Sequence, residues 1–232
     1  MIGQSVGKSF AYIVGVYLGD GCVTTQTSKG RYTYTVFRLN TIDADFAAST
    51  KSALEELGSR WATVSVHAVS KSSKPNHSLA ARHDDLCARL VELTDGKKKL
   101  PDDVFLWSGD EQIAFIAGLM DSEGFVAANK NPTNRRYYMG FKSCDLWVPD
   151  FIRLLESVGV MVGKVSTEAP RKPGYKVPMR FTIKMQSWID AGCYFNVQRK
   201  QTRVWEWASC GAYERRALHP RRLTSETTRQ TA

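Results

Sequence analysis

The chain carries the same short motif twice, and this repeat constrains its fold more than any other feature of the sequence. Residues 11–21 read AYIVGVYLGDG and residues 114–124 read AFIAGLMDSEG, an offset of 103 residues. In each copy small residues recur at every fourth position, and an acidic residue and a glycine close the motif. Apolar segments with this spacing predict two buried helices whose small-residue stripes allow close approach. We therefore expect the helices to pack together about a pseudo-twofold axis.

The order of predicted elements after each motif also repeats. A hairpin, an amphipathic helix ending in glycine, two further strands and a final helix follow in each half. In the first half these elements are predicted at 22–41, 43–58, 61–70, 77–82 and 83–93, and in the second at 125–145, 147–159, 161–168, 176–184 and 186–195. The sequence thus predicts an α+β fold of two pseudo-twofold αββαββα halves with antiparallel sheets. The halves span 1–95 and 111–213, with a linker at 96–110 and a basic tail at 214–232.

The net positive charge of the chain indicates what kind of molecule it binds. The 232 residues include 32 basic and 23 acidic side chains, which gives a net charge of +9. Residues 1–100 contribute 13 basic and 9 acidic residues, and residues 101–232 contribute 19 and 14. Such an excess favours a polyanion, either nucleic acid or an anionic membrane surface. Because both halves share the excess, we expect a partner that touches both halves.

Cysteine usage and hydropathy indicate the compartment. The five cysteines are far apart and include no CxxC pair, which argues against a disulfide framework and a zinc site. No apolar run approaches the length of a membrane span, and the apolar stretch 10–19 runs into Asp20-Gly21 without a cleavage site. These features predict a protein of the cytoplasm or an organelle interior that is not secreted and does not bind a membrane.

The acidic residues that close the two motifs indicate metal chemistry. Asp20 and Glu123 are predicted at helix C-terminal ends, where the helix dipole disfavours negative charge, and Gly21 and Gly124 are predicted to be left-handed caps. If the stripes pack, the two carboxylates lie close together, and one takes up a proton unless a cation intervenes. Carboxylates and helix-end carbonyls suit Mg²⁺ or another hard divalent cation. Such an ion can activate a water and stabilise the leaving oxygen of a phosphodiester.

With these features the chain resembles the monomeric LAGLIDADG homing endonucleases, which carry two such motifs. The first copy, IVGVYLGDG at 13–21, departs from the family motif at Leu18 and Gly19, where the motif has Asp and Ala. The second copy, IAGLMDSEG at 116–124, follows the motif closely. The resemblance covers the whole chain, since the repeated halves and the basic charge fit it as well.

The resemblance implies a saddle of two antiparallel sheets that lies in the major groove of double-stranded DNA. It further implies that Asp20 and Glu123 bind metal ions beneath the minor groove, with the carbonyls of Gly19 and Ser122 as further ligands. Both DNA strands are then cut across the minor groove, leaving short 3′ overhangs. By the same analogy, polar partners of the site follow the second strand of each half: Thr41 and Asp145.

Family members often have a basic residue near the end of each half that positions water or phosphate. The candidates lie in the runs KKKLP and QRKQ, and the sequence does not choose among them. Aligning KLPDDVF with KQTRVWE pairs the candidates as Lys99 with Lys200 and Lys97 with Gln198; Lys98 lies in the same run. Each of them also fits a solvated surface side chain.

Strand alternation assigns the face of the saddle that meets DNA. Phe37, Leu39 and Phe141 are predicted to face the helices, so their neighbours point the opposite way. Polar and amide side chains on that face suit hydrogen bonding to base edges, although an ordinary solvated face would also be polar. The predicted DNA-contacting residues are Thr24, Gln26, Ser28, Arg38, Asn40, Asn129, Asn131, Arg136, Tyr138 and Lys142, and Tyr32 and Tyr34 extend the face.

Three functions fit these observations. The first is an intron-type, sequence-specific double-strand DNA endonuclease that acts as a monomer. The second is a maturase that binds intron RNA with the same saddle, and the third is a DNA-binding regulator that does not cleave. Because an acidic residue closes both motifs, and neither RNA binding nor regulation requires them, the sequence favours the nuclease.

Overall fold

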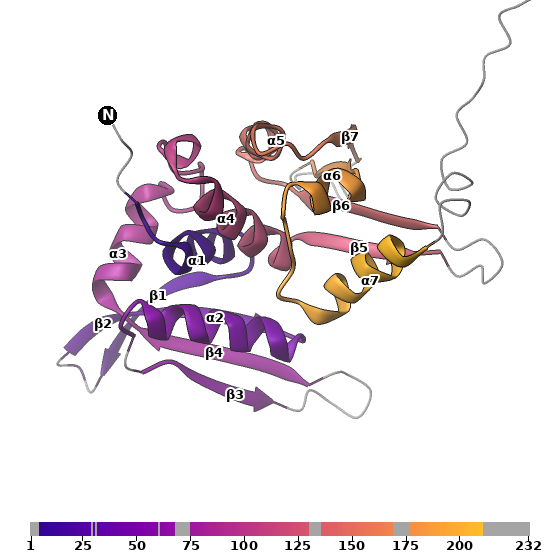
Figure 1. Cartoon of the computed structure of the whole chain (residues 1–232). Helices are drawn as coiled ribbons and strands as arrows, with labels where there is room; N and C mark the ends of the chain where they lie inside the picture. The colour runs from indigo at the N-terminus through magenta and orange to yellow at the C-terminus, as the bar shows by residue number, and fades with distance from the viewer. Residues whose placement is uncertain are drawn as a thin grey trace, which may run out of the picture.

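The chain forms two successive halves with the same order of helices and strands (Figure 1). The computed structural model describes residues 5–28, 30, 32–59, 61–67, 75–129, 136–168 and 177–210, so Asn131 and the predicted basic tail lie outside the described residues. The first half contains α1 (Lys8–Leu18), β1 (Cys22–Ser28), β2 (Tyr32–Thr41), α2 (Ala44–Glu56), β3 (Thr63–His67), β4 (Asn76–Arg82) and α3 (Asp84–Leu93). The second contains α4 (Gly109–Ser122), β5 (Gly124–Ala128), β6 (Tyr137–Ser143), α5 (Val148–Ser157), β7 (Val162–Thr167), β8 (Met179–Ile183), α6 (Met185–Asp190) and α7 (Gln198–Ser209).

Each half contains one four-stranded antiparallel sheet. The strand order is β1-β2-β4-β3 in the first sheet and β5-β6-β8-β7 in the second, so the two sheets have the same topology. This arrangement confirms the predicted α+β fold of two repeated halves. Among the helices of the described residues, none combines the length and the apolar character that a membrane crossing requires.

Alternation along the strands separates a buried face from an outer face in each sheet. Phe37, Leu39 and Phe141 are buried in the core, as predicted. Arg38 lies opposite Cys22 on β1 and Ala80 on β4, on the face turned away from the helices. In the second sheet the equivalent pair is Lys142 on β6 and Arg180 on β8.

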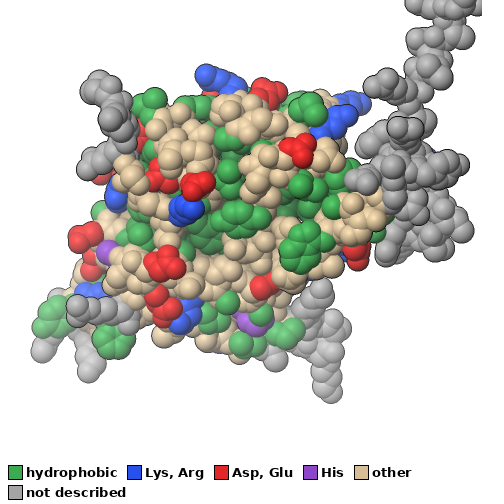
Figure 2. Space-filling view, viewed as in Figure 1, with side chains coloured by type: hydrophobic (Ala, Val, Ile, Leu, Met, Phe, Trp, Pro, Cys, Tyr) green, Lys and Arg blue, Asp and Glu red, His purple; other side chains and the backbone are tan. Residues whose placement is uncertain are grey.

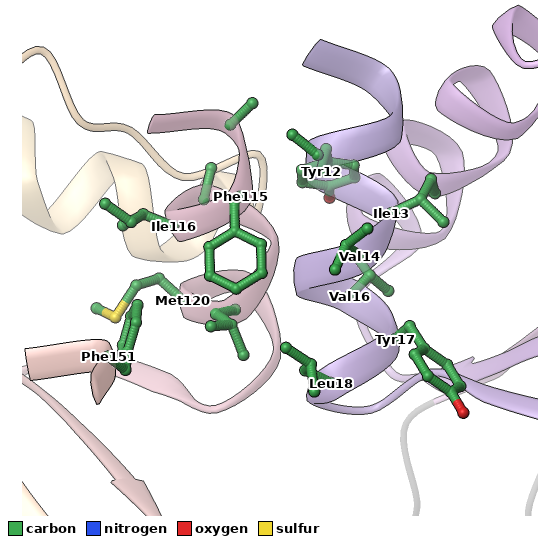
Figure 3. Packing of buried hydrophobic residues seen from close by; sticks show 14 of the residues in the cluster. Tyr12, Ile13, Val14, Val16, Tyr17, Leu18, Phe115, Ile116, Met120 and Phe151 are labelled. Carbon is green, nitrogen blue, oxygen red and sulfur yellow. The ribbon is translucent and has the colours of Figure 1, made fainter. Parts of the chain in front are cut away.

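The helices α1 and α4 pack in direct backbone contact at the centre of the molecule (Figures 1 and 3). A Cβ atom added to Gly15 would lie 2.2 Å from the carbonyl oxygen of Phe115. A Cβ added to Gly118 would lie 2.3 Å from the carbonyl oxygen of Tyr12. The two near-identical clashes are related by the 103-residue offset, so the predicted stripe contact and its pseudo-twofold symmetry are both present. Larger side chains on the other sides of these helices fill the core around them (Figure 3).

The prediction that Gly21 and Gly124 are left-handed caps is wrong, because neither has a positive φ. Their lack of a side chain serves close packing instead. A Cβ on Gly21 would lie 2.8 Å from the ring of Phe37 and 2.9 Å from the carbonyl oxygen of Val16. A Cβ on Gly124 would lie 2.5 Å from the carbonyl oxygen of Met120. Each glycine therefore lets the chain turn from the central helix directly into its first strand.

The end of the second half also differs from the prediction. The final helix expected at 186–195 is the short α6, and a longer helix that was not predicted, α7, follows it. The predicted linker is structured as well: it contains the 3-10 turn η1 (Val104–Leu106), and α4 already begins at Gly109. Ser108 and Glu111 form a capping box that fixes this start.

Candidate active site

The two motif acids lie at the C-terminal ends of the two central helices: Asp20 is two residues past the end of α1, and Glu123 directly follows α4. A Cβ on Gly19 would lie 2.3 Å from the Cβ of Ser122, so the residues before Asp20 and Glu123 touch. Burial raises the pKa of the Asp20 carboxyl. Burial, together with the negative charges of Asp20 and Asp145, raises the pKa of Glu123 to about 7. The helix contact thus brings two carboxylates, that of the exposed Asp20 and that of the half-buried Glu123, close enough for their charges to repel.

One lysine from each half reaches the carbonyl groups at the end of its own central helix. Lys97 Nζ donates to the carbonyl oxygens of Gly19 at 2.7 Å and Gly21 at 3.0 Å. Lys200 Nζ donates to those of Met120 at 2.9 Å and Asp121 at 2.6 Å. Burial lowers the pKa of both amines, to about 8 for Lys200, which is only 3% exposed. These cations neutralise helix C-termini that would otherwise present only carbonyl oxygens and acids.

The structure therefore pairs Lys97 with Lys200, and the predicted pairing of Lys99 with Lys200 is wrong. Lys99 instead forms a 2.5 Å ion pair with Asp102 on the surface. Lys98 is exposed and lies 3.4 Å from Asp95. Gln198 is exposed, and its side chain donates to Thr202 on the same helix, away from the acids. Lys97 and Lys200 are separated by the same 103 residues as the two motifs. Aligning the sequences KLPDDVF and KQTRVWE had paired Lys200 with Lys99 instead.

Lys97 stands in an unusual backbone conformation. Its φ is 74° and that of Asp95 is 45°, in the left-handed region that non-glycine residues seldom adopt. The buried hydroxyl of Thr94 accepts a hydrogen bond from the Lys97 N–H at 3.1 Å and helps to hold this turn. Non-glycine residues with positive φ concentrate at functional sites, where surrounding contacts enforce them.

Asp121 is a buried polar residue of the site that the sequence reading missed. Its carboxylate accepts hydrogen bonds from the backbone N–H groups of Asn196 and Val197, from the Asn196 side chain and from the hydroxyl of Tyr12. Asn196 and Val197 lead directly into α7, which carries Lys200. Asp121 thereby fixes the segment that places the lysine. The sequence did contain a signal for this role of Asp121. An acidic residue within an apolar, buried helix needs a specific hydrogen-bonding partner.

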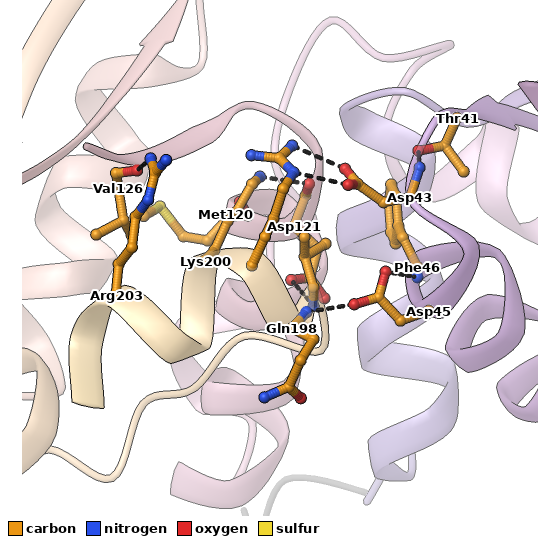
Figure 4. A network of polar contacts seen from close by, with 12 residues as sticks. Thr41, Asp43, Asp45, Phe46, Met120, Asp121, Val126, Gln198, Lys200 and Arg203 are labelled. Carbon is orange, nitrogen blue, oxygen red and sulfur yellow. Dashed lines mark hydrogen bonds and ion pairs between the residues drawn. The ribbon is translucent and has the colours of Figure 1, made fainter. Parts of the chain in front are cut away.

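The start of α7 is also bound to the first half (Figure 4). Arg199 makes two hydrogen bonds to Asp43, at 2.6 and 2.7 Å, and the backbone N–H of Gln198 donates to the Asp45 carboxylate. Asp43 and Asp45 lie just after β2, next to the predicted site residue Thr41, whose hydroxyl accepts from the Asp43 N–H at 3.1 Å. A helix of the second half is thus attached to the strand end of the first.

Asp145 lies close enough to affect the central groups. Its charge raises the pKa of both Lys97 and Glu123, although burial, the larger effect, lowers that of Lys97. Its carboxylate also accepts a 2.6 Å hydrogen bond from Ser143. Thr41 lies instead at the Asp43 turn. Of the two polar partners predicted from the sequence, Thr41 and Asp145, it is Asp145 that lies near the motif acids.

Two carboxylates, those of Asp20 and Glu123, are the side-chain oxygen ligands that this part of the molecule offers to a divalent cation. Among the described residues, no three His, Cys, Asp or Glu side chains come together as a metal cluster. The negative charge of Asp20 contributes to the raised pKa of Glu123, so the two carboxylates lie near each other and repel. Mg²⁺ typically uses one or two carboxylates and completes its coordination with water and phosphate oxygens. The carbonyl of Gly19 already accepts from Lys97, and the Ser122 hydroxyl donates to Gly118 at 3.0 Å.

The predicted DNA-contacting residues within the described chain lie on the outer faces of the two sheets. In the first sheet, Arg38 Nε donates to the Thr24 hydroxyl at 3.2 Å, and Gln26, Ser28 and Asn40 share this face by register. In the second sheet, Asn129 accepts from the Arg136 N–H at 2.8 Å, and Tyr138 and Lys142 alternate with buried residues. In the view of Figure 2, acidic and basic side chains are interspersed over the described surface rather than gathered into one patch.

Solved homing endonucleases share this fold. I-DmoI, in complex with DNA and Mn, has a TM-score of 0.51 at 17% identity, covering 79% of this chain and 93% of that chain. The LAGLIDADG meganuclease I-AabMI, bound to uncleaved DNA, has a TM-score of 0.50 at 12% identity, covering 90% of this chain and 93% of that chain. The chain therefore has the fold of the LAGLIDADG homing endonucleases.

Sequence comparisons are less extensive. No protein family model matches the chain. An uncharacterized protein of Methanocaldococcus jannaschii is 28% identical over 131 residues, which is 56% of this chain and 43% of that protein. The chain thus spans less than half the length of this relative.

Proposed function

We propose that this protein is a sequence-specific endonuclease that cuts both strands of duplex DNA with the help of Mg²⁺ or another divalent cation. The observation that carries this proposal is the convergence of Asp20 and Glu123 at the ends of two helices in backbone contact. No structural role accounts for two carboxylates there, because the helix dipoles and their mutual repulsion both disfavour the pair. Proteins of the same fold have been crystallised with DNA and Mn and with DNA and Ca.

The residues of the chain have distinct parts in this reaction. Asp20 and Glu123 would hold the cation, which when bound supplies a polarised water and stabilises the leaving oxygen. Lys97 and Lys200 hold the helix-end carbonyls in place and add positive charge near the scissile phosphates. One acid and one lysine from each half provide for two strands, so a monomer suffices. The expected products carry short 3′ overhangs.

The outer faces of the two sheets supply DNA binding in this proposal. Arg38, Arg136 and Lys142 lie on those faces with polar neighbours that can reach base edges. The net charge of +9 favours association with the phosphate backbone, and binding should weaken steeply with salt. Contact with an intron RNA through the same faces is the second candidate, and the test below separates the two.

The decisive test is cleavage of a randomised duplex DNA library with MgCl₂ or with EDTA. The expected result is enrichment of one family of cut sites in Mg²⁺ only, with paired cuts on the two strands that leave 3′ overhangs. Binding of duplex DNA without cleavage under any divalent cation would instead support a regulator. Binding of structured RNA in preference to DNA would support a maturase.

A further inference from the structure

The outer face of the second sheet carries an acid that contacts two cations. Glu168, directly after β7, binds Lys142 of β6 through Oε2 at 2.5 Å. Its other oxygen, Oε1, lies 3.7 Å from Nη1 of Arg180 on β8. These contacts hold the pKa of Glu168 below its usual range, chiefly through the hydrogen bond from Lys142. The carboxylate is therefore ionised on a face that we propose meets a polyanion.

An ionised carboxylate is costly on such a face unless it meets a hydrogen-bond donor. Phosphates offer no donor, and in the major groove the donors on base edges are the amino groups of cytosine and adenine. The ion pairs with Lys142 and Arg180 are each more than a third exposed, so they contribute little and can be exchanged for base contacts. Glu168 is thus suited to choosing a base rather than to adding affinity.

The first half has no such cluster at the equivalent positions. Lys142 lies opposite Arg180, which in turn lies opposite Ser166, two residues before Glu168. In the first sheet the matching register is Arg38 opposite Ala80, and Ala80 opposite Thr63, which places Ser65 where the second half has Glu168. The acid and its second cation are therefore particular to the second half.

The order of the strands indicates which base pair fits. Across the sheet the strand order is β6, β8, β7, so the three residues are rooted in the order cation, cation, carboxylate. Once the ion pairs of Glu168 are exchanged for base contacts, the side chains can be presented to DNA in this order. The major-groove edge of a G·C pair presents acceptor, acceptor, donor, namely guanine N7 and O6 and then cytosine N4. An A·T pair presents acceptor, donor, acceptor and fits the cluster less well.

We propose that Lys142, Arg180 and Glu168 form a base-reading cluster that selects a G·C pair in the part of the DNA site bound by the second half. The cations donate to guanine, and Glu168 accepts from the cytosine amino group. Arg180 also lies over the ring of Phe125, with its guanidinium carbon 4.9 Å from the ring centroid, which limits its freedom before binding. This inference rests on the proposed function, since it takes the outer face of the second sheet to meet DNA.

The test is a binding selection from a randomised duplex library with the full chain in EDTA, followed by sequencing. Wild-type protein should enrich G·C at one position in one half of the site. Glu168→Gln should reduce the preference for G·C at that position about 10-fold and leave the other positions unchanged. Its total affinity for DNA should be equal or higher, because one negative charge is removed. The matched control is Glu156→Gln, which makes the same change at an exposed residue of α5, on the helical side. It should leave the profile unchanged.

Variants of the cations separate base reading from phosphate binding. Arg180→Gln and Lys142→Gln should weaken selection at the same position as Glu168→Gln. A uniform loss of affinity across all sequences would mean that they bind phosphate, and the cluster would be refuted. An A·T preference, or an unchanged Glu168→Gln profile beside normal cleavage, would overturn the inference but leave the proposed function intact. If no DNA is enriched or cleaved, both proposals fail.

Discussion

Lys200 follows Lys97 by 103 residues, and the two amino groups bind the carbonyl ends of the two central helices, one in each half. Asp20 and Glu123 are separated by the same offset. The repeat therefore extends beyond the motif letters to the cation that accompanies each acid. This pairing arranges the charged groups of the candidate site as two acid and lysine sets about one helix contact.

The acids are expected to be needed for cleavage only. Asp20→Asn and Glu123→Gln should each lower the cleavage rate about 100-fold or more, the scale for loss of one charged group that stabilises a reacting centre. DNA affinity should be kept or rise, because a negative charge facing phosphate is removed. Thermal melting and gel-shift affinity are measured beside the cleavage rate, with the exposed Asp102→Asn as control. Undiminished cleavage by either variant would remove that residue from the active site.

Lysine variants distinguish the structural pairing from the alternatives that the sequence left open. Lys97→Met and Lys200→Met should each reduce cleavage, and Lys200→Met should also destabilise the fold by about 1–3 kcal/mol, because buried carbonyl groups lose their donor. Lys99→Met should change neither property, since its side chain pairs with Asp102 on the surface. Equal effects of Lys99→Met and Lys97→Met on cleavage would contradict the assignment.

The raised pKa of Glu123 predicts a pH-dependent stability without divalent cations. Folded Glu123 titrates at about 7, whereas the ordinary value is 4.5. The protonated carboxyl therefore stabilises the folded state fully below pH 4.5, and this stabilisation is lost as the pH rises through 7. In EDTA, the melting temperature of wild type minus that of Glu123→Gln should fall between pH 5 and pH 8. A constant difference across this range would show that the carboxyl is not perturbed.

The contact between α1 and α4 should tolerate no added methyl group. Gly15→Ala and Gly118→Ala place a Cβ 2.2 and 2.3 Å from a carbonyl oxygen of the facing helix. Each should lower the free energy of unfolding by about 1–3 kcal/mol or more through overpacking. Gly109→Ala, in the same helix as Gly118, is the control, because a Cβ there meets nothing within 4 Å. Chemical denaturation measures all three, and equal stabilities would argue against the backbone contact.

Asp121 is expected to act on the reaction through the placement of Lys200. Asp121→Asn replaces one acceptor oxygen by an NH₂ group that faces N–H donors, which should destabilise the protein by about 1–3 kcal/mol. It should also lower the cleavage rate at temperatures where the variant remains folded. The control is Asp150→Asn, the same change at a half-exposed side chain of α5. If the folded variant cleaves at the wild-type rate, Asp121 has a purely structural role.

Local pattern was enough to predict the architecture and the contact between the two central helices. Helical spacing of Gly15 and Gly118 predicted the helix contact, and alternation around Phe37 and Phe141 predicted the faces of the sheets. These features depend on periodicity, which a single sequence displays directly.

Features that depend on tertiary contact were missed. Asp121 and Asn196 are 75 residues apart, and Asp43 and Arg199 are 156 apart, so nothing local links them. The roles of Gly21 and Gly124 were misassigned for a related reason. A glycine after a helix is usually a left-handed cap, and only the packed structure shows that it is close approach to Phe37 and Met120 that excludes a side chain here.

The hydrogen bond between Tyr12 and Asp121 also determines which halves can pair. The residue equivalent to Tyr12 in the second half is Phe115, and the residue equivalent to Asp121 in the first half is Leu18. Two first halves would therefore bring tyrosine against leucine. Two second halves would bring phenylalanine against Asp121, which would keep its donors from Asn196 and Val197 but lose the tyrosine hydroxyl. Only the pairing of unlike halves forms the hydrogen bond between Tyr12 and Asp121. If the halves were produced as separate chains, this single contact would favour the mixed complex over either homodimer.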